Sequence, residues 1–407
     1  MKKNAIFIIF LFFTSCIFLP AHALEEKEEE KKSWVSYNVG RGIKIEGLDF
    51  TIKPKGTFVL QGTPDPNNAG SGKLDTSWIV CVDIEKKLGQ WGNTFVRFEQ
   101  GAGETVTPDL SLFNDINYNA YAAHGNIRAR KFWYQQYLLD KQFIVSVGKF
   151  NAKDHVDQNK YADDDDIQFL TYMFNLSPVV EWPTEYSFGI CADIYPKAID
   201  FLDFKIDYFE ADANWRNIFE HGLYAASVNF KPASLLGISS EEWNGNYRFY
   251  GWINSRRHSK IVAQNQAQRD SGEVNYGFST SFDQELPGGF GAFGRFGWQR
   301  PDVIPASPHE SDGATIEWAW SLGAQMDGRY WRREKDILAF AVGQLVPSEK
   351  YKDTGNPHRS EGHIETYYRY YLTDYFTIGP DFQLIWNPHG TNENPVFVYG
   401  VRTHMVF

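Results

Sequence analysis

Apolar and polar residues alternate one by one along most of this chain. The clearest stretch puts Ile316, Trp318, Trp320, Leu322, Ala324 and Met326 on one face and small or polar residues on the other. The same period of two recurs over 78–84, 186–190, 202–208, 274–282 and 376–386. Because side chains of a β-strand point alternately to its two faces, this pattern indicates strands with one apolar and one polar face. The sequence therefore predicts an all-β fold.

About sixteen strands are expected, joined by connections of alternating length. The predicted strands are 43–62, 76–87, 91–101, 130–139, 142–150, 185–195, 201–210, 221–230, 246–255, 274–285, 290–300, 315–328, 336–346, 362–372, 376–386 and 396–407. Short connections include 88–90, 140–141, 196–200, 286–289 and 373–375, and long ones are 63–75, 102–129, 151–184, 256–273, 301–314, 347–361 and 387–395. Only 231–245 departs from the alternation. Short periplasmic turns on one rim and long extracellular loops on the other are typical of a transmembrane antiparallel β-barrel.

The composition fits a barrel better than a globular core. Aromatic residues make up 16% and hydrophobic residues 43% of the 407 residues, yet the mean hydropathy is only −0.43. A barrel accounts for both values, because its rings face lipid while half of every strand faces water. So many rings exclude disorder, and three cysteines exclude a disulfide scaffold. A secreted carbohydrate-active β-protein is the more distant alternative.

The N-terminus predicts export. Lys2 and Lys3 precede an apolar run over 5–19, and Ala21-His22-Ala23 has the form of a signal-peptidase site. We therefore expect a signal peptide over 1–23 cleaved after Ala23, an acidic periplasmic segment over 24–42, and a barrel domain over 43–407 in the outer membrane of a Gram-negative bacterium. The net charge of −11 disfavours nucleic acid as a partner.

The last strand carries a further signal. Phe397, Tyr399, Val401, Thr403, Met405 and Phe407 share one face, and the chain printed here ends on that phenylalanine. This pattern resembles the assembly signal of outer-membrane barrel proteins.

Several motifs resemble those of the carbohydrate-selective porin family, the OprB type. They are Trp133-Tyr134-Gln135-Gln136, Val147-Gly148-Lys149-Phe150, Asn159-Lys160-Tyr161, Ile167-Gln168-Phe169-Leu170, Phe293-Gly294-Arg295-Phe296-Gly297-Trp298, Glu365-Thr366-Tyr367-Tyr368, Leu372-Thr373, Pro380-Asp381-Phe382-Gln383, Asn387-Pro388-His389-Gly390 and Gly400-Val401-Arg402. The resemblance implies a sixteen-stranded barrel that passes sugars across the outer membrane. A general diffusion porin, or a channel for another small solute, is the alternative within the barrel class.

The alternation also predicts which polar side chains line the pore. The inward set is Arg97, Glu99, Arg248, Tyr250, Trp252, Arg295, Glu365, Arg369, Asp381, Gln383, Arg402 and His404. Mixed arginines, carboxylates and aromatic rings suit an uncharged sugar, whereas a ring of one charge sign favours ions. Each arginine has a structural alternative as a wall charge paired with a carboxylate. Loop 151–184, which carries Trp182, is the first candidate to fold inward, and loop 102–129 is the second.

No enzymatic site, cofactor or metal is predicted. The sequence holds no G-x-S-x-G or H-E-x-x-H motif, and His358 and His363 do not have the spacing of zinc ligands. The run Asp163 to Asp166 is interpreted as a solvated extracellular loop, and whether it binds a cation is open. Whether Cys81 and Cys191 pair is open, as is whether the barrel is a monomer or a trimer. The expected partners are carbohydrate solutes, outer-membrane lipid and lipopolysaccharide.

Overall fold

The structure, a computed structural model, describes residues 35–45, 48–64, 72–122, 125–183, 185–238, 241–261, 270–305 and 315–407. The predicted signal peptide and the acidic segment up to residue 34 lie outside these residues.

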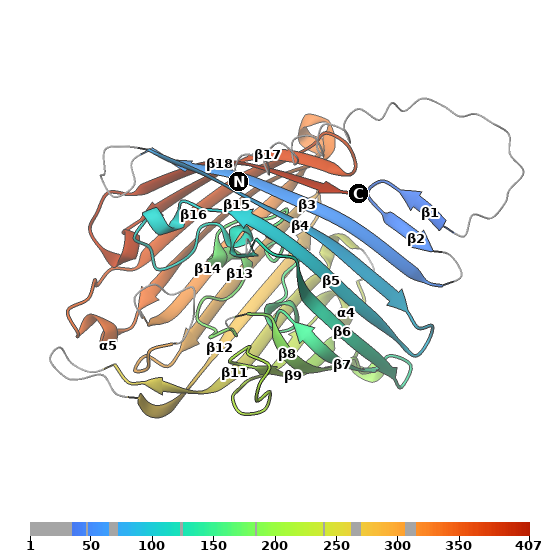
Figure 1. Cartoon of the computed structure of the whole chain (residues 1–407), viewed down its shortest axis with the longest axis horizontal. Coiled ribbons are helices and arrows are strands. Elements are labelled where there is room, and N and C mark those ends of the chain that lie inside the picture. The colour runs from blue at the N-terminus through green and yellow to red at the C-terminus, as the bar shows by residue number, and fades with distance from the viewer. Residues whose placement is uncertain are drawn as a thin grey trace, which may run out of the picture. The chain divides into compact units, whose positions relative to one another are not determined.

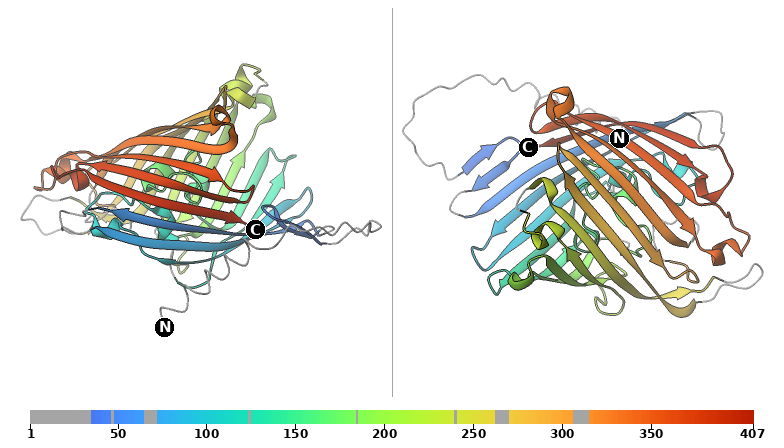
Figure 2. Two further views of the ribbon diagram at one scale, coloured as in Figure 1. Left: turned by 90° about the horizontal axis from the view of Figure 1, so that it is seen from above. Right: turned by 180° about the vertical axis from the view of Figure 1, so that it is seen from behind.

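Sixteen strands of the described residues, β3 to β18, form one closed antiparallel barrel. Each strand pairs with the next along the chain, and β18 pairs back to β3 from Tyr399 opposite Gly62 to Val406 opposite Lys55. Figures 1 and 2 show the strands side by side around the barrel. Their bounds are β3 (Phe50–Thr63), β4 (Lys73–Lys87), β5 (Gly92–Gly103), β6 (Arg128–Leu138), β7 (Phe143–Phe150), β8 (Ser187–Ile194), β9 (Leu202–Glu210), β10 (Gly222–Phe230), β11 (Gly245–Ser259), β12 (Asp270–Leu286), β13 (Phe290–Gln299), β14 (Ile316–Gly328), β15 (Arg333–Pro347), β16 (Glu361–Tyr371), β17 (Phe376–Trp386) and β18 (Val396–Val406). The predicted all-β, transmembrane antiparallel barrel of about sixteen strands is confirmed.

The start of the barrel differs from the prediction. The single strand expected over 43–62 is divided into β2 (Gly42–Ile45) and β3, and β1 (Val35–Asn38) forms a hairpin with β2. β2 pairs with the first residues of β3, placing Ile43 opposite Ile52. These residues of β3 extend beyond Lys55, the last one paired with β18. The hairpin therefore covers a strand end that the barrel leaves unpaired.

The two rims differ as the loop lengths predicted. The short rim carries tight turns and the helical pieces η4 (Lys197–Ile199), α4 (Pro232–Leu235), η5 (Glu241–Trp243) and η7 (Arg329–Trp331). The exceptional connection 231–245 contains α4 and η5. The long loops carry η2 (Thr107–Asp109), η3 (Tyr118–Ala122), α2 (Lys153–Val156), α3 (Tyr172–Asn175), α5 (Glu349–Lys352) and η8 (Pro388–Gly390). Among the described residues, no helix combines the length and apolar character of a membrane-spanning one.

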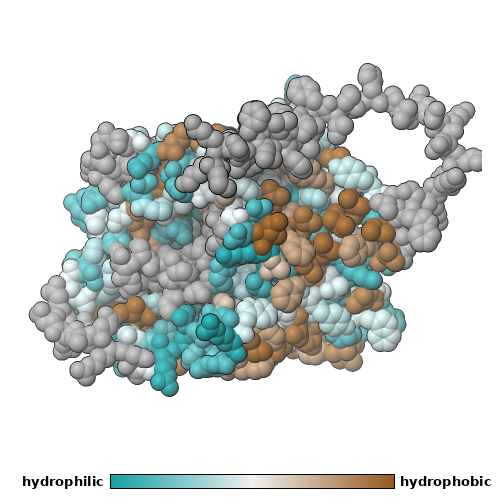
Figure 3. Space-filling view, in the orientation of Figure 1, coloured by the Kyte–Doolittle hydropathy of each residue, from teal (hydrophilic) through white to brown (hydrophobic). Residues whose placement is uncertain are grey.

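The apolar positions of the strands face outward. Val274, Tyr276 and Phe278 of β12 are 40–44% exposed, whereas Asn275 between them is fully buried. Phe397, Tyr399 and Val401 of β18 are likewise exposed. Apolar side chains gather over the face where β3 to β6 lie in front (Figure 3). The outer surface thus suits lipid.

One residue lies on the opposite face from its prediction. Ile316 was expected beside Trp318 on the apolar outer face, but it is buried with residues of the barrel interior. A register shift between Ile316 and Trp318 in the pairing of β14 with β15 explains this. Because the side-chain period of a strand is two, a one-residue irregularity moves a side chain to the other face.

A charge on the lipid face should destabilise the barrel. Leu322 is exposed at the middle of β14. The substitution Leu322→Arg should lower the free energy of unfolding by about 2–4 kcal/mol. Reversible urea unfolding in lipid vesicles measures this. The control Leu236→Arg, in the exposed short-rim connection, should cost less than about 1 kcal/mol. Equal costs at both positions would contradict the placement of β14 in the bilayer.

Candidate functional site: the barrel lumen

Two long loops lie inside the barrel and pack against its inner wall. In the first inner loop (104–122), Val106, Leu110, Leu112 and Ile116 pack on Ile385, Val396 and Val398 of β17 and β18. The second inner loop (151–183) contributes to two further buried clusters. One contains Tyr161, Ala162, Phe169, Met173, Phe174 and Val179 with residues of β13 to β16, and the other contains Ala152, Val156, Tyr172, Leu176, Val180 and Trp182 with residues of β7 to β11. The hydrophobic core of this protein is therefore the interface between inner loops and wall.

Glycines on the inner wall make room for the second inner loop. A Cβ atom at Gly297 of β13 would lie 2.5 Å from Val179, and one at Gly343 of β15 would lie 2.6 Å from Met173. These separations are shorter than van der Waals contact, so a larger residue would force the loop side chains or their neighbours on the wall to shift.

A buried ion pair fixes the second inner loop to β13. Arg295 Nε lies 3.0 Å from both carboxylate oxygens of Asp157, and its Nη1 donates to the carbonyl of Phe174 at 2.8 Å. Both charged side chains are almost fully buried. Burial raises the pKa of Asp157, and the nearby Arg295 guanidinium opposes that shift. Because a buried charge is costly unless paired, this contact holds the loop only while both partners are present.

Strands β16 to β18 bind the backbone of both inner loops. The Glu365 carboxylate accepts hydrogen bonds from the amides of Leu170 at 2.5 Å and Thr171 at 2.9 Å. The other contacts of this kind go to loop carbonyl groups: Arg369 to Ile167, Gln383 to Ile116 and Arg402 to Asp165. Carbonyl and amide groups of the loops thus find partners on the wall instead of water.

Charged side chains of β3 to β6 form a separate part of the inner wall. Asp83 pairs with Arg97 at 2.5 Å and with Lys55 at 3.2 Å. Glu99 pairs with Arg130, whose guanidinium lies 4.1 Å from the centre of the Tyr186 ring. The side chains of Lys55, Asp83 and Arg97 keep 14–19% of their surface exposed. These five charged residues define the charged wall; Glu99 and Arg130 are nearly as buried as Arg295 of β13, and the other three are less covered.

The acidic run of the second inner loop points toward the charged wall. Thr57 of β3 donates to Asp166 at 2.6 Å, and Lys55 and Arg97 interact electrostatically with that carboxylate. Burial acts to raise the pKa of Asp166, but the charges of His404, Lys55 and Arg97 outweigh it, so the pKa is lowered. Burial and the charge of Asp166 raise the pKa of Asp165. The two adjacent carboxyl groups therefore differ in how readily they hold a proton.

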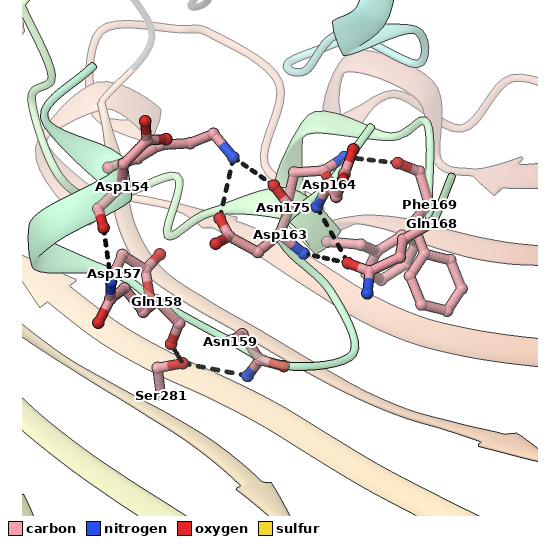
Figure 4. Close-up of polar contacts among 12 residues, drawn as sticks. Asp154, Asp157, Gln158, Asn159, Asp163, Asp164, Gln168, Phe169, Asn175 and Ser281 are labelled. Carbon is pink, nitrogen blue, oxygen red and sulfur yellow. Dashed lines mark hydrogen bonds and ion pairs between the residues drawn. The ribbon is translucent and has the colours of Figure 1, made fainter. Parts of the chain in front are cut away.

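Hydrogen bonds within the loop shape the acidic run (Figure 4). The amides of Asp163 and Asp164 donate to Gln168 Oε1 at 2.7 and 2.9 Å, and Lys153 pairs with Asp163 at 2.9 Å. Asp164 stays exposed. The run was expected in a solvated extracellular loop; it lies inside the barrel, where Asp165 and Asp166 contact inward residues of the wall while Asp164 keeps its exposure.

The predicted inward residues point into the barrel. Some of them bind the inner loops, and others pair with one another or with neighbours on the wall. Arg295, Glu365, Arg369, Gln383 and Arg402 hold the inner loops, as described above. Arg248 pairs with Asp283 at 2.5 Å, and Asp381 is buried beside Gln383. Trp182 and Trp252 are 6% and 2% exposed in one packed cluster. Their rings help to pack the second inner loop against the wall. Of the predicted residues, only Arg97 and Glu99 lie on the charged wall.

Sequence reasoning missed four residues of the lumen: Lys55, Asp83, Arg130 and Tyr186. Asp83 could have been found, since it alternates with the apolar residues of its strand. Tyr186 was expected on the apolar face of a strand, but β8 begins one residue later, at Ser187. Cys81 and Cys191 are buried and unpaired on β4 and β8.

Comparison with protein families and known structures supports one assignment. A family model described as "Carbohydrate-selective porin, OprB family" matches residues 81–407. The high-pH structure of Pseudomonas putida OprB is similar with a TM-score of 0.72 at 15% identity, covering 88% of this chain and 94% of that one. Porins from Rhodopseudomonas blastica (9% identity) and a loop-deleted OmpT from Vibrio cholerae (10%) have TM-scores of 0.51, each over 88% of this chain and all of theirs. No curated protein matches the chain in sequence. The solved structures support the fold, and the family model adds the family.

Loss of one partner of the Arg295–Asp157 pair should cost more than loss of both charges. Arg295→Leu leaves Asp157 buried and uncompensated, so the free energy of unfolding in vesicles should fall by about 3–5 kcal/mol. The double variant Arg295→Leu/Asp157→Asn removes both charges and should recover a large part of that loss. A double variant no more stable than the single one would contradict the pairing.

Proposed function

Because this chain belongs to the OprB family of carbohydrate-selective porins, we propose a path for the sugar through its lumen. The chain is an outer-membrane porin through which carbohydrates diffuse. The proposed path runs between the charged wall of β3 to β6 and the acidic run of the second inner loop. Lys55 and Arg97 lie on one side of it and Asp163 to Asp166 on the other.

The placement of the inner loops supports this path. The clusters that hold them cover the inner wall at β7 to β11 and at β13 to β18. On β3 to β5, by contrast, Lys55, Asp83 and Arg97 keep 14–19% of their side-chain surface exposed. A sixteen-stranded barrel is wide enough for an aqueous channel, so loops placed against the other walls narrow the water-filled space toward this side.

The chemistry of the two sides suits an uncharged sugar. Lys55 and Arg97 donate hydrogen bonds, while Asp83 and Asp164 accept them, and a sugar hydroxyl does both. Opposite charges face one another across the path, so neither cations nor anions of the medium are favoured as strongly as by a ring of one sign. Tyr186 adds an aromatic ring at the edge of the charged wall. The single observation that carries the proposal is that Lys55 and Arg97 of the charged wall act electrostatically on Asp166 of the acidic loop.

We extend the proposal to the rest of the chain. The protein acts as a passive channel and not as an enzyme, and no cofactor takes part. Its exposed apolar wall contacts outer-membrane lipid and lipopolysaccharide, and a part of that wall serves as the subunit interface if the barrels trimerise. Export uses a signal peptide cleaved after Ala23.

The sugar path is tested by single-channel recording in planar bilayers. Arg97→Gln removes a charged donor, and hydrogen bonds to charged groups contribute about 1.5–3 kcal/mol. The sugar concentration that half-blocks the current should therefore rise roughly tenfold or more. The matched control Arg300→Gln removes an arginine paired with Asp302 outside the charged wall and should leave the block unchanged. Equal block in both variants would overturn the path, and a wild-type current that no sugar affects would overturn its use by sugars.

A further inference from the structure

Three different donor side chains meet beneath the second inner loop. His155 comes from α2 of that loop, Cys191 from β8 and Asp207 from β9. Their nitrogen, sulfur and oxygen donor atoms all lie within 4.8 Å of one another. Cys191 and Asp207 are direct cross-strand neighbours, whereas His155 reaches them from the loop. The sugar path makes no use of these residues.

The carboxylate and imidazole groups of this cluster are buried with few hydrogen-bonding partners. Cys191 is fully buried and Asp207 is 3% exposed. Nδ1 of His155 has no hydrogen-bonding partner among the described residues, and no nitrogen or oxygen group there donates to the Asp207 carboxylate, which interacts with the Cys191 thiol. Burying a carboxylate without partners costs free energy, and metal coordination is one of the ways in which proteins satisfy a buried charge. Apart from the Cys191 thiol, the described side chains supply no partner for these atoms, and a metal ion would supply one.

Neighbouring residues pack against His155, and the nearest positive charge, that of Lys205, is paired with a carboxylate. The Phe150 ring meets the His155 ring edge-on at 4.9 Å between centroids. Lys205 donates to the His155 carbonyl at 3.1 Å and to Gln158 at 2.8 Å, and it lies 3.6 Å from Asp193. Asp193 thus offsets its charge. Burial, reinforced by Lys205, lowers the pKa of His155 to about 4.

We propose that His155, Cys191 and Asp207 bind one Zn²⁺ ion that ties the second inner loop to the barrel wall. Imidazole nitrogen, thiolate sulfur and carboxylate oxygen are all zinc ligands, and three protein ligands leave a fourth position for water. On binding, the Cys191 thiol releases its proton to solvent and the thiolate sulfur bonds to the ion. His155 is partly exposed, which gives the ion an approach from the lumen.

The consequence would be a stiffer lumen. His155 lies between Asp154, which pairs with Lys131, and Asp157, which holds Arg295. An ion at His155 would therefore add a third attachment within four residues of the second inner loop. Slow fluctuations of the open-channel current should decrease when zinc binds.

Metal titration of the intact, folded barrel in detergent tests the proposal. Competition with a chromophoric chelator should give one Zn²⁺ per chain. Cys191→Ser, Asp207→Asn and His155→Gln should each weaken binding at least about tenfold. Cys81→Ser removes the other buried cysteine and should bind like the wild type. Cd²⁺ should produce a thiolate-to-metal charge-transfer band that disappears in Cys191→Ser and persists in Cys81→Ser.

Two results would overturn the site. One is absence of stoichiometric binding by wild-type protein whose heat-modifiable gel mobility shows that the barrel is folded. The other is binding that survives in both Cys191→Ser and Asp207→Asn, which would place the ion elsewhere. Affinity should also fall as pH falls, because the Cys191 thiol must lose its proton when the ion binds. Block of the current by sugar, measured on the same preparations, tests the sugar path separately, so either proposal can fail without the other.

Discussion

The need to pair every backbone amide and carbonyl inside the bilayer governs this structure. Lipid offers no hydrogen bonds, so a membrane-spanning sheet must leave no open edge. The pairing of β18 with β3 meets this requirement by closing the sixteen strands into a ring. Closure also gives every strand an outside and an inside, and the period of two then assigns each side chain to lipid or to lumen.

The width of the lumen is a second constraint, and polar side chains on the inner face of the strands help to meet it. A barrel of this width holds more space than a selective channel needs, and two long loops occupy part of it. Their apolar residues pack on small or apolar positions of the wall, while Arg295, Glu365 and Gln383 bind loop backbone or side-chain groups. Much of the polar inner wall therefore serves to hold loops. Selectivity falls to the charged wall that remains, chiefly around Lys55, Asp83 and Arg97.

Alternation and loop length were enough to predict the strands and the inward direction of the polar side chains. They could not predict Ile316, because a register irregularity has no signature in the alternation. The partners of the inward residues were also out of reach: Arg295 and Asp157 are 138 positions apart, and only the folded loop brings them together. For the same reason Trp182, expected at the pore, is packed against the wall. The charge of the acidic run predicted a solvated loop but could not predict that Asp165 and Asp166 contact the inner wall.

The central claim is that the water-filled path passes the acidic run of the second inner loop. Asp164 is exposed in that run, and both native cysteines of the barrel are buried, so a thiol reagent should react only at the new side chain of D164C. Single-channel recording during labelling with a bulky, water-soluble reagent is the direct measurement. The path predicts a stepwise fall in conductance, delayed by a neutral sugar in the bath. Labelling, confirmed by mass spectrometry, that leaves the conductance unchanged would contradict it.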